Sequence, residues 1–237
     1  GVNGRGRGHV SGCAGLPNVE VAYLVDPDSK VFGRSLDSLK KSKAPAPKTI
    51  ADIREALEDK DLTAVSIATP NHWHSLMTIW ACQAGKHVYV EKPCSHDVYE
   101  GRIAVEASRK YNVIVQHGTQ QRSSSSRAGL MEAIHSGQFG KLKISHGYCC
   151  KPRGTIKHEK IEDPPENLDW NLWRGPADLD AFHDNYVHYN WHWFWKTGNG
   201  DIGNQGVHEM DVARWALKGA TLPKRVMSLG GRFGWDD

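Results

Sequence analysis

The 237-residue sequence has few features of a membrane protein, a nucleic-acid-binding protein or a disulfide scaffold. It contains no run of about 18 apolar residues, the length needed to span a bilayer. Its five cysteines are an odd number without CxxC spacing, which argues against disulfides and a zinc ribbon. The net charge is only +3 and basic clusters are short, so nucleic acid is not an expected partner. The sequence begins with Gly1 rather than Met, which leaves localisation open, with the cytoplasm as the default.

The composition is that of an ordinary globular protein. Hydrophobic residues make up 39% of the chain and charged residues 24%, with 24 glycines and 11 prolines. These proportions predict a packed core. At roughly 100–200 residues per domain, the length predicts two modest domains.

The first half of the sequence alternates strand-like and helix-like segments. Apolar runs typical of buried parallel strands occupy residues 19–25, 64–68, 87–91 and 113–117. Helices are predicted from a capping box at Thr49–Asp52 to about Glu58, and over residues 74–84 and 98–111. This alternation predicts an α/β fold, a doubly wound parallel sheet with helices on both faces.

The pattern changes near residue 120. A helix is predicted over residues 128–136, strands over 142–150 and 225–229, and a helix over 202–217. Residues 151–185 are rich in proline and irregular, as in a binding loop or lid. Trp191, Trp193 and Trp195 alternate at strand period, which places them on one face of a sheet. We therefore predict a first domain over residues 1–120 and a second over 121–237.

A glycine-rich loop opens the sequence. Gly1 and Gly6 are spaced as in loops that bring the backbone close to a pyrophosphate at a helix N-terminus. Asn3 replaces the middle glycine of G-x-G-x-x-G, a mild departure because Asn tolerates positive φ. Asp26 follows Gly6 by 20 residues and ends a strand, where a carboxylate accepts hydrogen bonds from ribose hydroxyls. The alternatives are that the glycine segment is a plain turn and that Asp26 is a turn residue before Pro27.

Polar side chains follow two further predicted strands. Lys92, in Glu91-Lys92-Pro93, is expected in the crevice beyond the strand ends, where it can donate to a substrate hydroxyl or transfer a proton. A lysine in solvent is the alternative. We predict a cis Lys92-Pro93 bond, since cis X-Pro costs only about 0.5–1 kcal/mol. Thr69-Pro70-Asn71-His72 follows the preceding strand, and no third metal ligand accompanies His72 and His74 at convincing spacing.

A polar helix face is predicted in the second half. Asn204, His208, Asp211 and Trp215 are spaced by four, three and four residues and therefore share one face. A histidine on such a face is typical of a helix that lines a substrate cleft. A solvated face with a hydrogen-bonded histidine is the alternative.

Together these segments resemble the glucose-fructose oxidoreductase, inositol dehydrogenase and rhizopine-catabolism (Gfo/Idh/MocA) family. The matching segments are GVNGRGRGH at residues 1–9, VDPD at 25–28, ATPNHWH at 68–74, AGKHVYVEKP at 84–93 and GNGDIGNQGVHEMDVARW at 198–215. The resemblance implies a Rossmann domain that binds NAD or NADP. It also implies an α/β domain with a mostly antiparallel open sheet, which often forms subunit contacts, so a homo-oligomer is expected.

The resemblance also implies residue roles. Lys92 and His208 correspond to the lysine and histidine that carry sugar or polyol chemistry in the family. Many members have Asp where this chain has Asn204, which makes Asp201 a third candidate and leaves the general base open among the three. The predicted cofactor-binding residues are Gly1, Asn3, Gly4, Arg5, Gly6, Asp26, Thr69, Pro70, Asn71, His72, Glu91 and Lys92. The predicted substrate-binding residues are Lys92, Arg122, Asn204 and His208, and no metal is predicted.

The sequence therefore predicts an oxidoreductase that moves a hydride between a sugar or polyol carbon and a nicotinamide. Asp26 favours NAD over NADP, because a carboxylate repels the 2′-phosphate; Arg34 is too far along the sequence to be weighed as a clamp for that phosphate. Two alternatives are an NAD-dependent glycosidase of the same fold and a non-catalytic dinucleotide-binding regulator.

The two ends of the sequence lead to a separate expectation, that the chain is a fragment. The glycine loop is normally preceded by a central strand, so its absence before Gly1 predicts a fragment that lacks both ends. The neighbouring strands, around Val21, Tyr23, Val65 and Ile67, would then expose unpaired edges. Such a chain is expected to aggregate and to bind NAD weakly.

Overall fold

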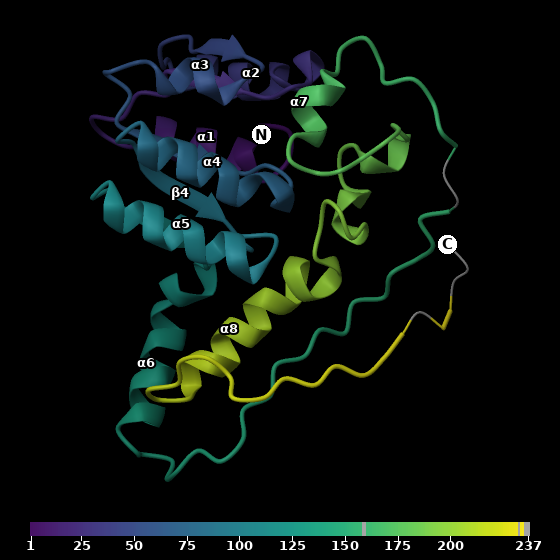
Figure 1. Ribbon diagram of the computed structural model, residues 1–237. Helices are drawn as coiled ribbons and strands as arrows, with labels where there is room; N and C mark the ends of the chain where they lie inside the picture. The colour runs from purple at the N-terminus through teal and green to yellow at the C-terminus, as the bar shows by residue number, and fades with distance from the viewer. Residues whose placement is uncertain (158–159, 232, 235–237) are drawn as a thin grey trace. The chain divides into compact units, whose positions relative to one another are not determined.

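The computed structural model describes residues 1–157, 160–231 and 233–234. They fall into two compact units, each described separately below (Figure 1). Unit 1 comprises Gly1–Gly118 and Glu159–Gly200, and unit 2 comprises Thr119–His158 and Asp201–Asp237. The predicted division at residue 120 gives two domains that follow each other along the sequence. In the structure, the segment Glu159–Gly200 belongs to unit 1 together with Gly1–Gly118.

Unit 1 contains two parallel sheets. Strands β1 (Tyr23–Val25) and β2 (Lys48–Ile50) form one, and β3 (Ala64–Ile67), β4 (His87–Glu91) and β5 (Val115–Gly118) form the other in that order. Val88 of β4 is paired with Val65 on one side and Val115 on the other. The predicted α/β class with parallel strands is confirmed. Among the described residues, β1 pairs only with β2 and β3 only with β4, so each has one unpaired edge.

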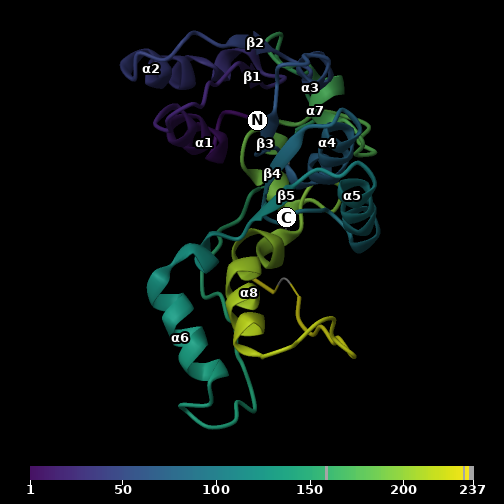
Figure 2. The ribbon, with the colours of Figure 1, turned by 90° about the vertical axis from the view of Figure 1, so that its left-hand side faces the viewer.

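Helices pack against both sheets through apolar side chains. The helices of this part are α1 (Arg5–Ala14), α2 (Gly33–Lys41), α3 (Ile53–Leu57), α4 (Asn71–Gln83) and α5 (Val98–Lys110), with a short 3₁₀ turn η1 (Ser29–Val31). Figure 2 shows α1 on one side of β3–β5 and α4 and α5 on the other. One buried cluster joins β1 to α1 and α2, and a second joins β3 and β4 to α4. Burial of these apolar side chains is the main favourable contribution to folding.

Two predicted helix starts in unit 1 were wrong. Thr49 does not cap a helix, because it lies in β2 and pairs with Leu24. The cap is Asp52, whose side chain accepts the Arg54 amide at 2.9 Å, and α3 begins at Ile53. Helix α4 begins at Asn71, directly after Pro70, rather than near His74.

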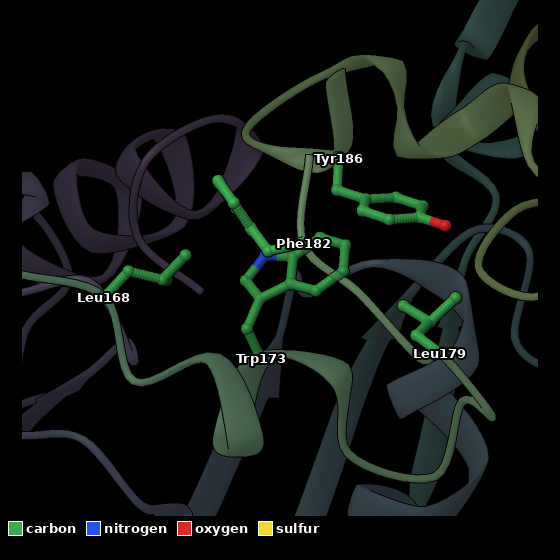
Figure 3. Close-up of a cluster of buried hydrophobic side chains, with 5 residues drawn as sticks. All are labelled: Leu168, Trp173, Leu179, Phe182 and Tyr186. Atoms are coloured by element: carbon green, nitrogen blue, oxygen red, sulfur yellow. The ribbon is translucent and has the colours of Figure 1, made fainter. Parts of the chain in front are cut away.

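Residues 160–200 fold around aromatic side chains. This segment contains α7 (Trp170–Arg174) and the 3₁₀ turns η3 (Asp184–Tyr186) and η4 (Asn190–Trp193). A buried cluster, drawn in Figure 3, consists of Leu168, Trp173, Leu179, Phe182 and Tyr186. The predicted tryptophan-bearing strand was wrong. Trp191 and Trp193 lie in η4, where the backbone bonds locally, with the Phe194 amide donating to the Trp191 carbonyl.

Unit 2 is built on two helices. They are α6 (Ser125–His135), preceded by the 3₁₀ turn η2 (Gln120–Ser123), and α8 (Val207–Ala216), preceded by a π-helical turn, η5 (Ile202–Gly206). The predicted helix over 202–217 is confirmed, with a π turn at its start. The helices predicted over 98–111 and 128–136 are confirmed as α5 and α6.

The strands predicted over 142–150 and 225–229 were wrong, because every described strand lies within residues 23–118. The described residues of unit 2 therefore form no open antiparallel sheet. Segment 142–150 instead runs along α8, where Ser145 Oγ donates to the Ala213 carbonyl at 2.8 Å. A strand needs a partner for its backbone groups, and the described part of unit 2 provides none.

Candidate functional site

The glycine loop is packed against the ends of two strands. The Gly1 amine donates to the Val25 carbonyl at 3.0 Å, at the end of β1. A Cβ on Gly1 would lie 2.7 Å from the Ala68 carbonyl oxygen, just after β3, and a Cβ on Gly6 would lie 2.0 Å from the Gly1 oxygen. Both contacts are too close for any side chain, so these two positions require glycine.

The N-terminus of α1 is open. Its N-cap residue, Gly4, contributes no side-chain hydrogen bond, and a Cβ there would meet no atom within 4 Å. The first amides of a helix without a side-chain cap point at whatever lies beyond it, and the helix dipole favours an anion there. The start of α1 therefore has the geometry of a phosphate-binding site.

A groove of about 420 Å³ begins beside this helix end. It is lined by Gly4, Arg5, Arg7, Gly8, Ser11 and Arg34. Three guanidinium groups and no carboxylate line it, which favours a negatively charged occupant. Arg7 Nε is buried without a hydrogen-bond partner among the described residues. Arg34 was set aside on sequence separation, but the start of α2 places it beside α1.

Asp26 is buried at the end of β1 and holds the glycine loop. Its Oδ2 accepts the Val2 amide at 2.9 Å and its Oδ1 accepts the Asp28 amide at 3.1 Å. Each carboxylate oxygen can accept a second hydrogen bond. The expected bonds to ribose hydroxyls stay a prediction, and the backbone contacts show a structural role in addition.

The turn between β3 and α4 contains a polar atom with no described partner. Thr69 Oγ1 is buried and unpaired among the described residues. Asn71, by contrast, donates from Nδ2 to Asn199 Oδ1 at 2.8 Å. Of the predicted cofactor contacts in this turn, Thr69 thus retains a free hydrogen-bonding group next to the glycine loop.

His72 and His74 are buried and face backbone carbonyls. His72 Nε2 lies 3.1 Å from the Trp173 oxygen and Nδ1 lies 3.4 Å from that of Thr197. Burial lowers the pKa of His72 to about 4, although both carbonyl contacts act in the opposite direction. Burial also lowers the pKa of His74, whose ring nitrogens face the Pro93 and Thr69 carbonyls. Both rings anchor backbone segments.

Lys92 follows β4 between two anchored residues. The Lys92-Pro93 peptide bond is cis, which confirms the sequence prediction. Pro93 contacts His74 through its carbonyl oxygen. On the other side Glu91 is buried, with its Oε1 accepting from Arg5 Nε at 3.1 Å and facing His9 Nε2 at 2.9 Å. Lys92 itself is half-buried.

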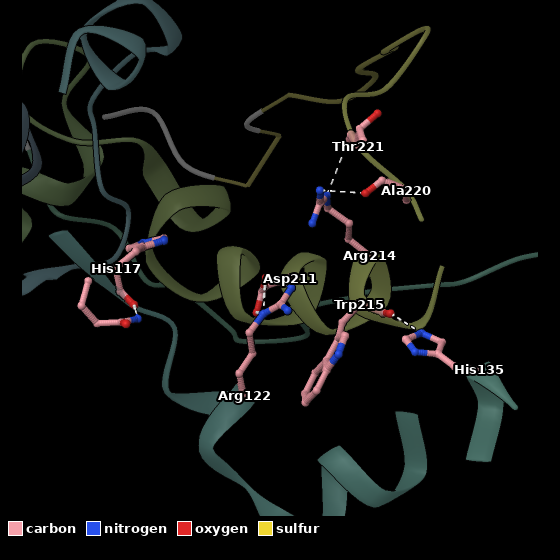
Figure 4. Close-up of polar contacts among 9 residues, drawn as sticks. His117, Arg122, His135, Asp211, Arg214, Trp215, Ala220 and Thr221 are labelled. Carbon is pink, nitrogen blue, oxygen red and sulfur yellow. Dashed lines mark hydrogen bonds and ion pairs between the residues drawn. The ribbon is translucent and has the colours of Figure 1, made fainter. Parts of the chain in front are cut away.

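The predicted substrate-binding Arg122 forms an ion pair inside unit 2 (Figure 4). Its Nε and Nη2 donate to the two carboxylate oxygens of Asp211 at 2.8–3.1 Å, and its guanidinium lies 5.0 Å from the centre of the Trp215 ring. The hydrogen bonds to Asp211 raise the pKa of Arg122. These contacts place Asp211 and Trp215 on one face of α8, as their spacing predicts.

Asp201 is also paired. Its carboxylate accepts Arg153 Nε at 2.9 Å and Nη2 at 2.6 Å. A carboxylate held by two guanidinium hydrogen bonds is a poor proton acceptor, so the pair disfavours Asp201 as a general base. Asn204 lies in the π-helical turn η5 and His208 in the first turn of α8, both half-buried. Single π turns within helices are frequent at functional sites.

Unit 1 thus gathers the glycine loop, Asp26, Thr69 and Glu91-Lys92 at the carboxyl ends of β1, β3 and β4. In open α/β sheets ligands bind at this edge. The other candidates belong to unit 2 and are Arg122, Asp201, Asn204 and His208.

The sequence analysis assigned no role to His9 or Arg153 and set Arg34 aside. The signal for His9 was its place in the segment GVNGRGRGH at residues 1–9.

Two family models match separate parts of this chain. The family model described as "Oxidoreductase family, NAD-binding Rossmann fold" matches residues 1–119, and one described as "Oxidoreductase family, C-terminal alpha/beta domain" matches residues 142–228. A levoglucosan dehydrogenase from Pseudarthrobacter phenanthrenivorans is 26% identical over 76% of this chain and 42% of its own. A glycosyl hydrolase family 109 protein from Shewanella baltica is 27% identical over 60% of this chain and 32% of its own.

A solved structure supports the fold. The WlbA dehydrogenase from Bordetella pertussis, in complex with NADH and UDP-GlcNAcA, superposes with a TM-score of 0.66 and 19% identity, covering 92% of this chain and 55% of that one. The chain spans about half the length or less of the curated relatives it matches.

Proposed function

Because the chain belongs to the Gfo/Idh/MocA oxidoreductase family, whose first domain has an NAD-binding Rossmann fold, we propose that it transfers a hydride between a sugar or polyol carbon and nicotinamide. The observation that carries this proposal is the position of Lys92. It follows β4, and the neighbouring strand β3 ends next to Ala68, against which Gly1 is packed. Glu91, beside Lys92, accepts a hydrogen bond from Arg5 in the first turn of α1. A proton-transferring group near a phosphate-binding cradle suits dehydrogenase chemistry.

The residues present fit a dinucleotide. Gly1 and Gly6 leave no room for side chains and keep the loop close to the strand ends, while Gly4 leaves the start of α1 open. The first amides of α1 would hold the pyrophosphate, Asp26 the adenosine ribose, and Thr69 Oγ1 has a hydrogen bond to offer. When bound, NAD supplies the acceptor for the hydride.

In the proposed reaction, side chains of the protein remove and donate protons. As its substrate hydroxyl becomes a carbonyl, one group must remove the hydroxyl proton and another must donate to the developing carbonyl oxygen. We assign these tasks to Lys92 and His208, without choosing which is the base. Asn204 orients substrate, since an amide takes no proton at neutral pH. Asp201, paired with Arg153, is the weakest of the three catalytic candidates.

The domain roles follow from this assignment. We propose residues 1–120 as the cofactor domain and 121–237 as the substrate and oligomer-forming domain, with a sugar or polyol as substrate and a homo-oligomer as the assembly. The name of the levoglucosan dehydrogenase supports a carbohydrate substrate. Asp26 supports NAD, whereas the arginines of the groove keep NADP as the alternative.

A ligand screen tests the proposal. Melting of the full-length protein is followed with NAD, with NADP and with each nucleotide plus a panel of sugars and polyols. A ligand at 100 times its dissociation constant stabilises by about 2.7 kcal/mol, so binding is readily seen. We expect a carbohydrate that stabilises only in the presence of the nucleotide. Stabilisation by neither nucleotide contradicts the proposal.

The second candidate is an NAD-dependent glycosidase. The resemblance to glycosyl hydrolase family 109 proteins favours it. Such an enzyme oxidises the sugar only transiently, eliminates the aglycone and reduces the product, so NADH does not accumulate. Aryl glycosides separate the two reactions: a glycosidase releases the phenol with catalytic NAD, and a dehydrogenase does not.

A further inference from the structure

Glu91 is a buried carboxylate that belongs to the same strand end as Lys92. It is only 5% exposed. An ionised carboxylate removed from water is costly unless charged or polar partners surround it. Its partners therefore indicate the role of the residue, and two of them are side chains of α1.

Two side chains of α1 converge on one oxygen of Glu91. Arg5 Nε lies 3.1 Å and His9 Nε2 2.9 Å from Oε1. The Arg5 side chain is largely exposed, so its ion pair is weakened by solvent. The His9 side chain is only 13% exposed, which makes it the stronger support.

The His9 ring is itself fixed. Its Nδ1 lies 2.7 Å from Ser66 Oγ in β3, and its ring meets Tyr89 of β4 edge-on at 5.2 Å between centroids. With the hydroxyl of Ser66 donating to Nδ1, Nε2 is the ring nitrogen that donates to Glu91. His9 thus links α1 to the neighbouring strands β3 and β4 of the larger sheet.

The second oxygen of Glu91 completes the link. Oε2 accepts the backbone amide of Lys92 at 3.3 Å. A continuous series of contacts therefore runs from the helix that begins at the glycine loop, through His9 and Glu91, to the backbone of Lys92. All of it lies within unit 1.

We propose that His9 and Glu91 are positioning residues that fix Lys92 relative to the glycine loop. The inference rests on the proposed function of Lys92, and it replaces the predicted role of Glu91 as a cofactor ligand. Neither side chain takes part in proton transfer to the substrate. Their loss should change how often Lys92 is correctly placed, and so kcat, more than nucleotide affinity.

The test compares three variants of the full-length protein. His9→Leu removes the donor to Glu91, His9→Gln keeps an amide N–H that reaches it, and His87→Leu is the control, a histidine at the opposite end of β4. We expect kcat to fall at least tenfold in His9→Leu and to be unchanged in His87→Leu. In His9→Gln, kcat should fall by no more than the square root of the factor lost in His9→Leu. The dissociation constant of NAD should stay within threefold in all.

Glu91→Gln gives a second measurement in case His9→Leu does not fold. It keeps an oxygen toward His9 but turns an amide N–H₂ toward the Lys92 amide, so kcat should again fall at least tenfold. An unchanged kcat in a folded Glu91→Gln or His9→Leu protein overturns the positioning role, as does equal loss of kcat and NAD affinity. Lys92→Ala is measured alongside. If it keeps the full rate, the proposed function fails as well, which distinguishes the two failures.

Discussion

The two units bury their apolar side chains very differently. Unit 1 contains two clusters that join strands to helices and a third built from aromatic residues. Among the described residues of unit 2, the buried apolar side chains are those of Met131 and Ala216. Unit 2 is held instead by polar contacts such as Arg122–Asp211 and the bond from His135 to the Trp215 carbonyl.

This difference shows what local sequence pattern can build. In unit 1 each strand of the larger sheet is separated from its neighbour by one helix, so short βαβ segments contain everything that they need. In unit 2 the extended segments 142–150 and 225–229 have no described strand to pair with. Exposed ion pairs and hydrogen bonds contribute little stability compared with a buried apolar cluster.

The largest expected effect concerns Lys92. Lys92→Ala should lower kcat by about 10²–10⁴-fold, the usual contribution of a general acid or base. The dissociation constant of NAD should stay within several-fold, because the proposed pyrophosphate site lies at the start of α1. Steady-state kinetics and a fluorescence titration with NAD measure the two quantities, and Lys110→Ala, at an exposed lysine of α5, is the control. Collapse of NAD binding in a folded Lys92→Ala protein contradicts the assignment.

Core substitutions test the contrast in packing. Leu24 of β1 is 1% exposed, and Leu24→Ala should lower the free energy of unfolding of unit 1 by about 2–5 kcal/mol. Leu130 of α6 is 49% exposed, and Leu130→Ala should change stability by less than about 0.5 kcal/mol. Denaturant titrations followed by near-ultraviolet circular dichroism compare the two. Equal losses would show that unit 2 has a core of its own.

The pH dependence of stability tests the buried histidine of unit 1. The pKa of His72 falls to about 4 on folding from an ordinary value of 6.5. The native state then binds fewer protons than the unfolded state between these values, so its stability is full above pH 6.5 and is lost as pH falls toward 4. The loss attributable to His72 is about 3 kcal/mol. The buried His74 acts in the same direction.

Unfolding measured between pH 7 and 4 should show this loss in the wild type and a shallower slope in His72→Asn. His87→Asn, at an exposed histidine, should follow the wild type. Identical slopes in all three proteins would place the pH sensitivity elsewhere.

The smallest expected effect concerns nucleotide choice. Asp26→Ser should shift the ratio of kcat/KM for NAD and NADP toward NADP by about tenfold, or 1.4 kcal/mol, because a repelling charge is removed. Adding Arg34→Ala should reverse much of that shift if the groove receives the 2′-phosphate. An unchanged ratio in Asp26→Ser removes this residue from the ribose site.

The site residues that the sequence placed correctly in space lie in unit 1. The glycine spacing, Asp26 and Glu91-Lys92-Pro93 belong to strand ends that the local pattern located, so they could be placed at the carboxyl ends of parallel strands in advance. The pairing of Asp201 with Arg153 was not foreseeable, since the two residues are 48 positions apart and Arg153 lies in the irregular, proline-rich segment. The surroundings of His9, which was missed, and of Arg34, which was set aside, were hidden for a related reason: they depend on how helices pack on the sheets.

The most direct test of the account is the stoichiometry of NADH formation. The full-length protein is incubated with NAD and the carbohydrate found by the ligand screen, and NADH and oxidised product are quantified together, with Lys92→Ala in parallel. The account predicts one NADH for each molecule of carbonyl product in the wild type and essentially none in the variant. Product formation without NADH, or an equal rate in Lys92→Ala, would contradict it.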